Sequence, residues 1–322
     1  MNIVRLGNTE QHVSAMCLGA MNFGSATPAD VSYRLLDMYV DAGGSFIDTA
    51  NIYAQWVPGF VGGESETLLG RWMKERGNRD GIFLATKVGG PMPGIEKGLR
   101  AAQIEAEIEK SLTRLQTDYV DLYYEHLDDR LTPFEESLAA FDRLIRDGKV
   151  RTIGASNLTS WRLEEALWTS RTRGFAAFCC LQQRHSYLRP KTGHPFGSPN
   201  AGTWFGVQVP TSDELFDVLR SRPVTLLAYS PTLSGMYGRD DRGIPDEYYG
   251  PDSDARLAAL QQVVRETGAS PNQIVLAWIM QTDPPAIPLI AASNEQHLAE
   301  NLAAGDIQLT PGQLERLDEA GA

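Results

Sequence analysis

Short apolar runs alternate with longer amphipathic segments along most of the chain. In the longer segments the apolar residues recur every three or four positions, whereas the short runs are apolar almost throughout. This alternation is typical of parallel β-strands connected by crossover helices, because strands buried on both faces carry nearly continuous apolar runs. The pattern therefore predicts a β/α protein.

The number of units decides between the possible β/α folds. Predicted strands cover residues 15–19, 45–48, 82–87, 119–126, 151–155, 178–182, 224–229 and 286–290. Predicted helices cover residues 29–41, 65–76, 101–115, 133–147, 160–173, 213–220, 271–281 and 294–303. Eight units favour a closed (β/α)₈ TIM barrel formed as a single domain by residues 1–322, with a doubly wound sheet as the alternative. Residues 3–13 predict a small β-hairpin across the bottom of the barrel.

Three long segments interrupt the regular alternation, and each follows the end of a strand. They cover residues 54–63, 189–210 and 231–252. Their aromatic residues are more numerous than a disordered linker usually has: Trp56, Phe60, Phe196, Trp204, Phe205 and Tyr237. We therefore expect functional loops at the C-terminal face of the barrel.

Composition excludes several classes of partner. The net charge of -12 argues against nucleic acid, which requires concentrated Lys and Arg. No apolar run of 18 residues and no secretory leader pattern are present, so we expect a cytoplasmic protein without a membrane partner. Cys17, Cys179 and Cys180 suit buried reduced thiols. The oligomeric state stays open, with a homo-oligomer among the options.

Polar residues close several of the predicted strands, where a (β/α)₈ barrel carries its active site. Asp48 ends the second strand, Lys87 ends the third and His126 ends the fourth, while Tyr53 lies just beyond the second. A lysine in a barrel mouth requires a partner, because burial of a lone ammonium is very costly. Asp48 is the expected partner of Lys87.

These four residues suit the reduction of a carbonyl group. A nearby cation favours phenolate, so we expect the Lys87–Asp48 pair to lower the pKa of Tyr53 towards neutrality and make it a proton donor. His126 would orient the substrate and stabilise charge on its oxygen. The expected substrate-pocket residues are Tyr53, Trp56 and His126.

The chain resembles the aldo-keto reductase superfamily, whose catalytic tetrad is Asp, Tyr, Lys and His. The resemblance rests on the segments at residues 46–53, 85–87 and 126, and it continues through residues 63–70, 148–157 and 228–231 in the order of the family. It covers about residues 4–301. The resemblance implies catalytic roles for Asp48, Tyr53, Lys87 and His126, and a small-molecule carbonyl substrate.

The resemblance also implies an NADP(H) or NAD(H) cofactor and no metal. No glycine-rich dinucleotide fingerprint follows a strand, so a Rossmann cradle is not supported. Ser156, Asn157 and Gln182 would bind the nicotinamide carboxamide, with Gln183 as a competitor of Gln182, and Tyr229 would stack on the ring. The other implied cofactor-binding residues are Gly19, Ala20, Met21, Asp48, Ser230, Leu233, Ser234, Gly235, Ala291, Ser293, His297 and Asn301.

The adenosine end departs from the common family pattern. Many members bind the 2′-phosphate through basic residues after strand eight, but this chain has Ala291, Ser293 and His297 there. Without a guanidinium the 2′-phosphate loses its best partner. We therefore expect either modest discrimination between NADPH and NADH or a preference that depends on His297 and thus on pH.

Three alternatives compete with a reductase. A nucleotide-binding sensor or regulatory subunit would share the fold and turn over little substrate. An aldolase-type barrel would use Lys87 as a Schiff-base nucleophile, although Asp48 would hold that lysine protonated. A metal-dependent hydrolase at Glu125, His126 and Asp128 lacks a second histidine ligand. The identity of the carbonyl substrate is open.

Overall fold

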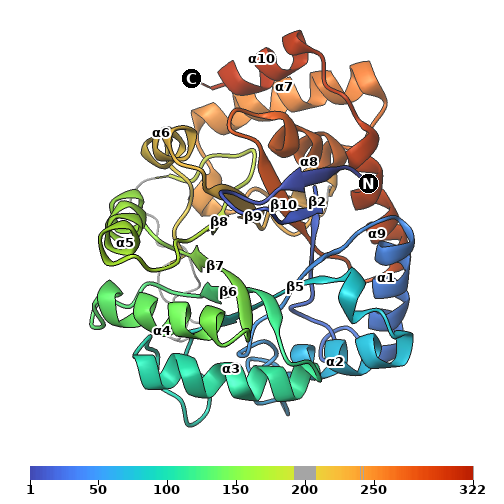
Figure 1. The fold of residues 1–322 in the computed structure, drawn as a ribbon. Helices are drawn as coiled ribbons and strands as arrows, with labels where there is room; N and C mark the ends of the chain where they lie inside the picture. The colour runs from blue at the N-terminus through green and yellow to red at the C-terminus, as the bar shows by residue number, and fades with distance from the viewer. Residues whose placement is uncertain (192–207, 240, 242, 322) are drawn as a thin grey trace.

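The computed structural model describes residues 1–191, 208–239, 241 and 243–321, and its centre is a closed barrel of eight parallel strands (Figure 1). Their order around the barrel is β10-β3-β4-β5-β6-β7-β8-β9. The strands are β3 (Cys17–Gly19), β4 (Phe46–Asp48), β5 (Phe83–Val88), β6 (Val120–Glu125), β7 (Val150–Ser156), β8 (Cys180–Arg184), β9 (Thr225–Tyr229) and β10 (Ala286–Ile290). The predicted (β/α)₈ barrel is confirmed, and the doubly wound sheet is wrong.

Helices surround the barrel on the outside (Figure 1). They are α1 (Ala29–Asp41), α2 (Glu64–Arg76), α3 (Ala101–Leu115), α4 (Phe134–Arg146), α5 (Ser160–Arg173), α6 (Asp213–Ser221), α7 (Pro251–Thr267), α8 (Pro271–Gln281), α9 (Glu295–Ala303) and α10 (Pro311–Glu319). The described residues also form short 3₁₀ helices: η1 (Arg79–Gly81), η2 (Met236–Gly238), η3 (Asp246–Tyr248) and η4 (Ala304–Asp306). All eight predicted helices are present within one or two residues.

Two helices were not predicted, α7 and α10. Both pack on α8 and on each other, outside the β/α alternation on which the prediction depended. A signal for α10 was present, because Thr310, Pro311 and Gln313 repeat the capping box that Ser270, Pro271 and Gln273 form at the start of α8.

The three predicted loops have different outcomes. Residues 54–63 connect β4 to α2 without a helix or strand. Residues 231–252 contain η2 and η3, and α7 begins at Pro251. Most of residues 189–210, including Phe196, Trp204 and Phe205, lies outside the described residues. Tyr237 is buried, and its hydroxyl bonds Ser186 and the Leu188 N–H, so it has a structural role.

An antiparallel hairpin of β1 (Ile3–Arg5) and β2 (His12–Ser14) covers the end of the barrel where the strands begin, as predicted (Figure 1). Leu6 and Val13 pack on interior side chains such as Cys17 and Phe46. The Gly7 N–H also donates to Thr225 Oγ1 at 2.8 Å, at the start of β9. The hairpin closes this end of the barrel, so an active site has to lie at the opposite end.

Side chains along each strand alternate between the barrel interior and the layer under the helices. On β6, Leu122 and Tyr124 belong to the interior cluster, whereas Tyr123 belongs to the outer cluster. Ala85 on β5 and Phe46 on β4 are likewise interior. By this alternation Asp48, Lys87 and His126 share the inward face of their strands, and Glu125 faces outward.

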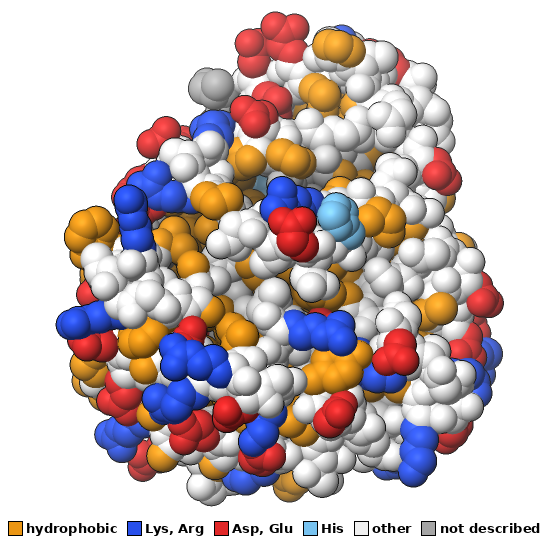
Figure 2. Space-filling model, viewed as in Figure 1, with side chains coloured by type: hydrophobic (Ala, Val, Ile, Leu, Met, Phe, Trp, Pro, Cys, Tyr) orange, Lys and Arg blue, Asp and Glu red, His pale blue; other side chains and the backbone are white. Residues whose placement is uncertain are grey.

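The surface is mixed in charge. Figure 2 shows basic and acidic side chains interspersed over the visible face, without a large basic area. Within the described part of the chain, no helix is long and apolar enough to cross a membrane. Cys17, Cys179 and Cys180 are buried free thiols, as expected.

Candidate active site

The four tetrad side chains meet at the C-terminal ends of β4, β5 and β6. Asp48 is the last residue of β4 and is paired in register with Ala85 on β5. Lys87 pairs with Tyr124 on β6, and His126 follows β6 directly. Parallel strands end at the same edge of the barrel, which brings residues distant in sequence together.

Lys87 is the centre of this arrangement. Its side chain is fully buried, and its ammonium donates to an Asp48 carboxylate oxygen, to the Thr49 carbonyl at 2.8 Å and to Tyr53 Oη at 2.8 Å. All three ammonium protons therefore have acceptors. Burial by itself lowers the pKa of Lys87, but Asp48 and Tyr53 outweigh it and the net pKa is raised, so the lysine is an ammonium ion.

The contact with Lys87 leaves the Tyr53 proton available. Since the Tyr53 oxygen accepts from Lys87, its own O–H can donate elsewhere, and the described residues provide it with no acceptor. Tyr53 is 6% exposed, in contrast to the fully enclosed Asp48 and Lys87. It is therefore the member of this trio that a substrate could reach.

The expected pKa of Tyr53 was wrong in direction. Burial raises the pKa of Tyr53 to about 12, with Lys87 lowering it and Asp48 raising it again. Burial disfavours the phenolate, and the Asp48 charge offsets much of the attraction of Lys87. Burial likewise raises the pKa of Asp48, against the effect of Lys87. Tyr53 is consequently a neutral phenol, which is the form that donates a proton.

His126 lies beside Tyr53 as a neutral imidazole. The ring centroids are 6.0 Å apart with an interplanar angle of 79°. Burial, assisted by Lys87, holds the pKa of His126 well below its usual range. Its Nδ1 is buried without a hydrogen-bond partner among the described residues. A neutral ring of this kind can donate one hydrogen bond to a substrate oxygen.

The residues predicted to bind nicotinamide form one hydrogen-bonded chain next to the tetrad. Asn157 Nδ2 donates to the His126 carbonyl at 3.1 Å and to Ser156 Oγ at 2.9 Å. Tyr229 Oη donates to Asn157 Oδ1 at 2.8 Å, and Ser156 Oγ donates to the Gln182 carbonyl at 2.9 Å. The structure brings the side chains of Ser156, Asn157 and Tyr229 together with the backbone of Gln182 at the mouth of the barrel.

Gln182 and Gln183 differ in the face of β8 that they occupy. Gln182 Nε2 donates to Asp48 Oδ2 at 3.0 Å, inside the barrel. Gln183 Nε2 instead donates to the Leu158 carbonyl at 2.7 Å. The geometry favours Gln182 for the carboxamide.

The segment that contains the predicted cofactor-binding residues Ser230, Leu233, Ser234 and Gly235 has an unusual backbone. Ser230, Leu233 and Ser234 have φ of 54°, 49° and 61°, and Gly235 has φ of 79°. A positive φ is uncommon for residues other than glycine and is found mostly where function requires it. Backbone turns of this kind can direct successive N–H groups towards an anion. In this turn, however, the Leu233 N–H donates to the Ser230 carbonyl at 3.1 Å and the Gly235 N–H donates to the Thr232 carbonyl at 2.9 Å.

Sequence reasoning missed Arg239, which lies next to this segment. A Cβ placed on Gly235 would be 4.0 Å from Arg239 Cδ. The Arg239 guanidinium is paired with Asp241 at 2.5 Å and is partly exposed. The sequence signal that could have indicated Arg239 was a basic residue shortly after the predicted cofactor-binding segment at 230–235.

The remaining predicted cofactor residues lie on either side of the strand ends. Gly19 pairs in register with Asp48, and the Ala20 N–H donates to the Asp48 carbonyl at 2.8 Å, while Met21 is exposed. On β10 and α9, Asn301 Nδ2 donates to the Ala291 carbonyl at 3.0 Å.

Ser293 and His297 are close at the beginning of α9. The Ser293 hydroxyl lies 3.4 Å from His297 Nδ1, and both residues are exposed. Arg34 of α1 also reaches α9, but it is paired with Glu295 at 2.5 Å and with Asp30 at 3.1 Å. Of Ala291, Ser293 and His297, the residues expected at the adenosine end, only His297 has a side chain that can carry a positive charge.

An apolar wall adjoins Tyr53. Trp56 lies edge-on to Tyr53 with 6.0 Å between ring centroids. Trp56 and Met92 both pack on the small cluster of Ala50, Ile52 and Tyr53. The predicted pocket residues Tyr53, Trp56 and His126 are thus neighbours.

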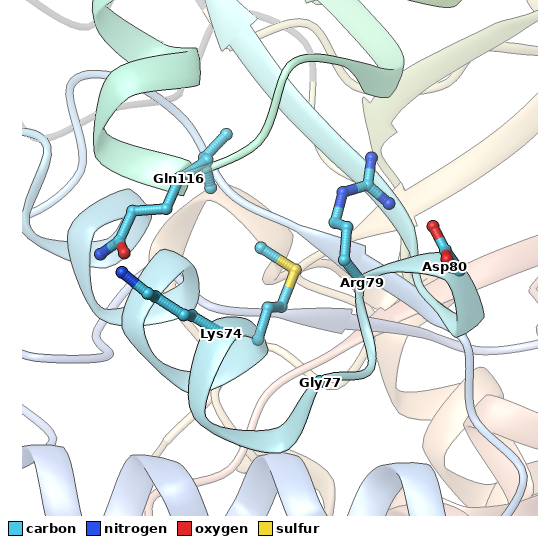
Figure 3. Close-up of a pocket in the computed structure, with 7 residues that line it drawn as sticks. Lys74, Gly77, Arg79, Asp80 and Gln116 are labelled. Atoms are coloured by element: carbon cyan, nitrogen blue, oxygen red, sulfur yellow. The ribbon is translucent and has the colours of Figure 1, made fainter.

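Two surface hollows lie away from these residues. One, of about 380 Å³, is lined by Lys74, Gly77, Arg79, Asp80 and Gln116 among others (Figure 3). It follows the end of α2, just before β5 begins, and so lies at the opposite end of the barrel from the tetrad. The other is lined by residues of α1 and the start of α2, including Tyr33 and Glu64. Neither is lined by a tetrad residue.

Of the residues considered for a metal site, Asp128 is engaged by two arginines. Asp128 pairs with Arg162 at 2.8 Å and with Arg130 at 3.0 Å. Over the described ranges, no group of three or more His, Cys, Asp or Glu side chains could hold a metal ion.

Comparisons with known proteins agree with this geometry. The sequence profile of the Aldo/keto reductase family matches residues 15–322. The uncharacterized oxidoreductase YrpG of Bacillus subtilis (strain 168) is 30% identical over 99% of this chain and 95% of its own length. Norsolorinic acid reductase B of Dothistroma septosporum is 28% identical over 96% of this chain and 78% of its own length.

A solved structure shows the same similarity in three dimensions. The crystal structure of the thermostable aldo-keto reductase Tm1743, in complex with the inhibitor epalrestat, superposes with a TM-score of 0.76. It is 28% identical, and the match covers 99% of this chain and all of the other. This chain, an oxidoreductase, therefore belongs to the aldo/keto reductase family.

Proposed function

We propose that the protein reduces an uncharged aldehyde or ketone with hydride from NADH or NADPH, and that Tyr53 donates the proton. The observation that carries this proposal is the contact of 2.8 Å from Lys87 Nζ to Tyr53 Oη, with Asp48 on the same ammonium. Lys87 is a hydrogen-bond donor to the phenol oxygen in the ground state and a counter-ion once that oxygen becomes phenolate.

The residues divide the proton chemistry among them. The carbonyl oxygen gains negative charge as its carbon is reduced, and Tyr53 gives its proton to that oxygen. Lys87 stabilises the resulting phenolate, and Asp48 keeps Lys87 charged. His126, neutral in this site, donates from Nε2 to the same oxygen and aligns it.

The described residues fit a nicotinamide dinucleotide. Ser156, Asn157 and Gln182 would hold the carboxamide, and the left-handed turn at residues 230–235, with Arg239 beside it, would hold the pyrophosphate. When bound, the cofactor supplies the hydride.

Cofactor preference follows from charge at the adenosine end. Ala291, Ser293 and Asn301 carry no charge, and Arg34 is already paired with two carboxylates. A 2′-phosphate would consequently have His297 as its titratable partner there. We propose modest discrimination between the two cofactors.

The substrate class follows from the wall beside Tyr53. Trp56 and Met92 are apolar, so an aromatic or alkyl carbonyl compound suits the site better than a charged one. Among relatives, an aryl-alcohol dehydrogenase of Pestalotiopsis microspora has a name that refers to aromatic alcohols. Aromatic aldehydes and ketones are therefore the first compounds to assay.

A Schiff-base mechanism does not fit the site. An imine requires a free amine, whereas all three protons of the Lys87 ammonium are engaged and its pKa is raised. Borohydride should therefore trap no substrate on Lys87.

A carbonyl panel with both cofactors tests the proposed function. Tyr53→Phe should reduce kcat by about 10²- to 10⁴-fold, because the proton donor is lost, while cofactor affinity measured by fluorescence titration stays within about twofold. Tight cofactor binding without turnover that depends on Tyr53 would instead support a nucleotide-binding sensor.

A further inference from the structure

Glu125 is a buried acid that the proposed mechanism does not use. It is the last residue of β6, directly before His126. Its side chain is fully buried, and neither carboxyl oxygen has a hydrogen-bond partner among the described residues. No other buried carboxyl group of the described chain lacks partners on both oxygens.

The neighbours of Glu125 offer no compensation for a negative charge. On the adjacent strands, the residues opposite it are Val88 and Ala155, which are uncharged. The charged groups that face it are Asp128 and Asp129 in the turn after β6, Arg162 on α5, and Lys97 before α3. Two of these four are themselves carboxylates.

Arg162, one of the two cations near Glu125, already has other partners. Arg162 donates to Asp128 at 2.8 Å and to Glu165 at 2.6 Å, and its guanidinium lies 3.9 Å from the centre of the Phe134 ring on α4. A Glu125 carboxylate could gain Arg162 only by competing with Asp128.

Burial raises the pKa of Glu125 well above its usual range, with Asp128 adding to the shift and Arg162 opposing it. The unfolded chain loses this proton at a lower pH than the folded chain does. Glu125 therefore lowers the free energy of unfolding at pH values above the ordinary glutamate pKa. This loss grows with pH until the folded protein also loses the proton. A costly buried acid adjacent to a site residue is a candidate for a functional role.

His126 is connected to these groups through the backbone. Its N–H donates to the Val88 carbonyl at 2.8 Å, and its carbonyl accepts from Asn157. Asp128, two residues later, is held by Arg162. A change in the pairing of Arg162 therefore acts on the short turn that carries His126.

We propose that Glu125 is a positioning residue for His126: the uncharged acid leaves Arg162 on Asp128 and His126 beside Tyr53, whereas the carboxylate competes for Arg162 and displaces the turn. The inference rests on the proposed function for its effect on turnover. Raising the pH would then weaken carbonyl alignment and reduce kcat.

Other buried groups near the reaction would not produce this change. Burial raises the pKa of Tyr53 to about 12 and places that of His126 well below its usual range. Asp48 and Tyr53 raise the pKa of Lys87 against the effect of burial. A titration step that Glu125→Gln removes is therefore attributable to Glu125.

Glu125→Gln provides the test, because it keeps the shape and removes the ionisation. Histidine labelled with ¹³C at Cε1 reports His126 by NMR without substrate, and thermal unfolding reports stability, both from about pH 5 to pH 10. In the wild type we expect the His126 signal to shift in one step as the pH rises. In Glu125→Gln we expect no such step and a higher Tm at neutral pH.

Turnover supplies the third readout. With an active carbonyl, wild-type kcat should fall by about tenfold across that step, whereas kcat of Glu125→Gln should stay level. Glu125→Asp should restore a step. Glu165→Gln is the matched control, because it removes the other carboxylate partner of Arg162 and should leave the wild-type step in place.

The outcomes separate this inference from the proposed function. A His126 signal that titrates identically in wild type and Glu125→Gln overturns the inference, even if carbonyl reduction is active. Absence of turnover together with a step that Glu125→Gln abolishes supports the link to His126 and overturns the proposed function. If Glu125→Gln does not fold, a wild-type His126 signal that is constant over the whole range overturns the inference.

Discussion

Lys87 Nζ lies 2.8 Å from Tyr53 Oη and simultaneously bonds Asp48, so one buried ammonium joins the proton donor to a carboxylate. Lys87→Met would leave the Asp48 charge buried and unpaired. We expect a loss of about 3–5 kcal/mol in the free energy of unfolding, measured by denaturant titration.

The double variant Lys87→Met with Asp48→Asn should regain most of that stability while carbonyl reduction remains lost. Lys149→Met is the control, because Lys149 forms an exposed pair with Glu109 and should cost less than about 1 kcal/mol. Equal losses for the two single lysine variants would contradict the buried pair.

Tyr53 should remain a phenol far into the alkaline range. Because burial raises its pKa to about 12, its proton is retained at every pH where the phenol is needed as a donor. Ultraviolet difference titration of wild type against Tyr53→Phe should show no phenolate from Tyr53 below about pH 10. A Tyr53 phenolate near neutral pH would restore the expectation from sequence that the structure overturns.

The adjacent glutamines of β8 form a matched pair of variants. Gln182→Leu removes a donor to Asp48 inside the barrel, and we expect NADH to bind about tenfold more weakly in a fluorescence titration. Gln183→Leu removes a bond to the Leu158 carbonyl outside the barrel. It should cost about 1 kcal/mol of stability and leave NADH affinity unchanged. The reverse pattern would assign the carboxamide to Gln183.

His297→Arg should supply the missing guanidinium for a 2′-phosphate. We expect NADPH to bind about tenfold more tightly and NADH to be unchanged. Gln296→Arg, one exposed position earlier on α9, is the control and should alter neither affinity much.

The wild type should discriminate only modestly between NADPH and NADH, because Ala291, Ser293 and Asn301 carry no charge to pair with a 2′-phosphate. A preference for NADPH of more than about a hundredfold that does not vary with pH would contradict this account.

Much of the fold could be predicted from local pattern. The apolar runs located all eight barrel strands, because a strand buried on both faces needs apolar residues almost throughout. α7 and α10 escaped the prediction because they pack on α8 rather than on the sheet, so the β/α alternation contains no place for them. Arg239 escaped it because its position beside Gly235 depends on how the turn folds.

The sequence by itself determined the barrel and the strand ends that carry Asp48 and Lys87, since polar residues closing apolar strands meet at one edge of a closed barrel. The choice between Gln182 and Gln183 needed the structure. Only the tertiary structure decided the charge states at the site. The pKa of Tyr53 is raised rather than lowered, and Glu125 has no hydrogen-bond partner among the described residues, because desolvation depends on what every neighbouring element brings to the site. The degree of desolvation is a property of the packed protein, and no local run of residues encodes it.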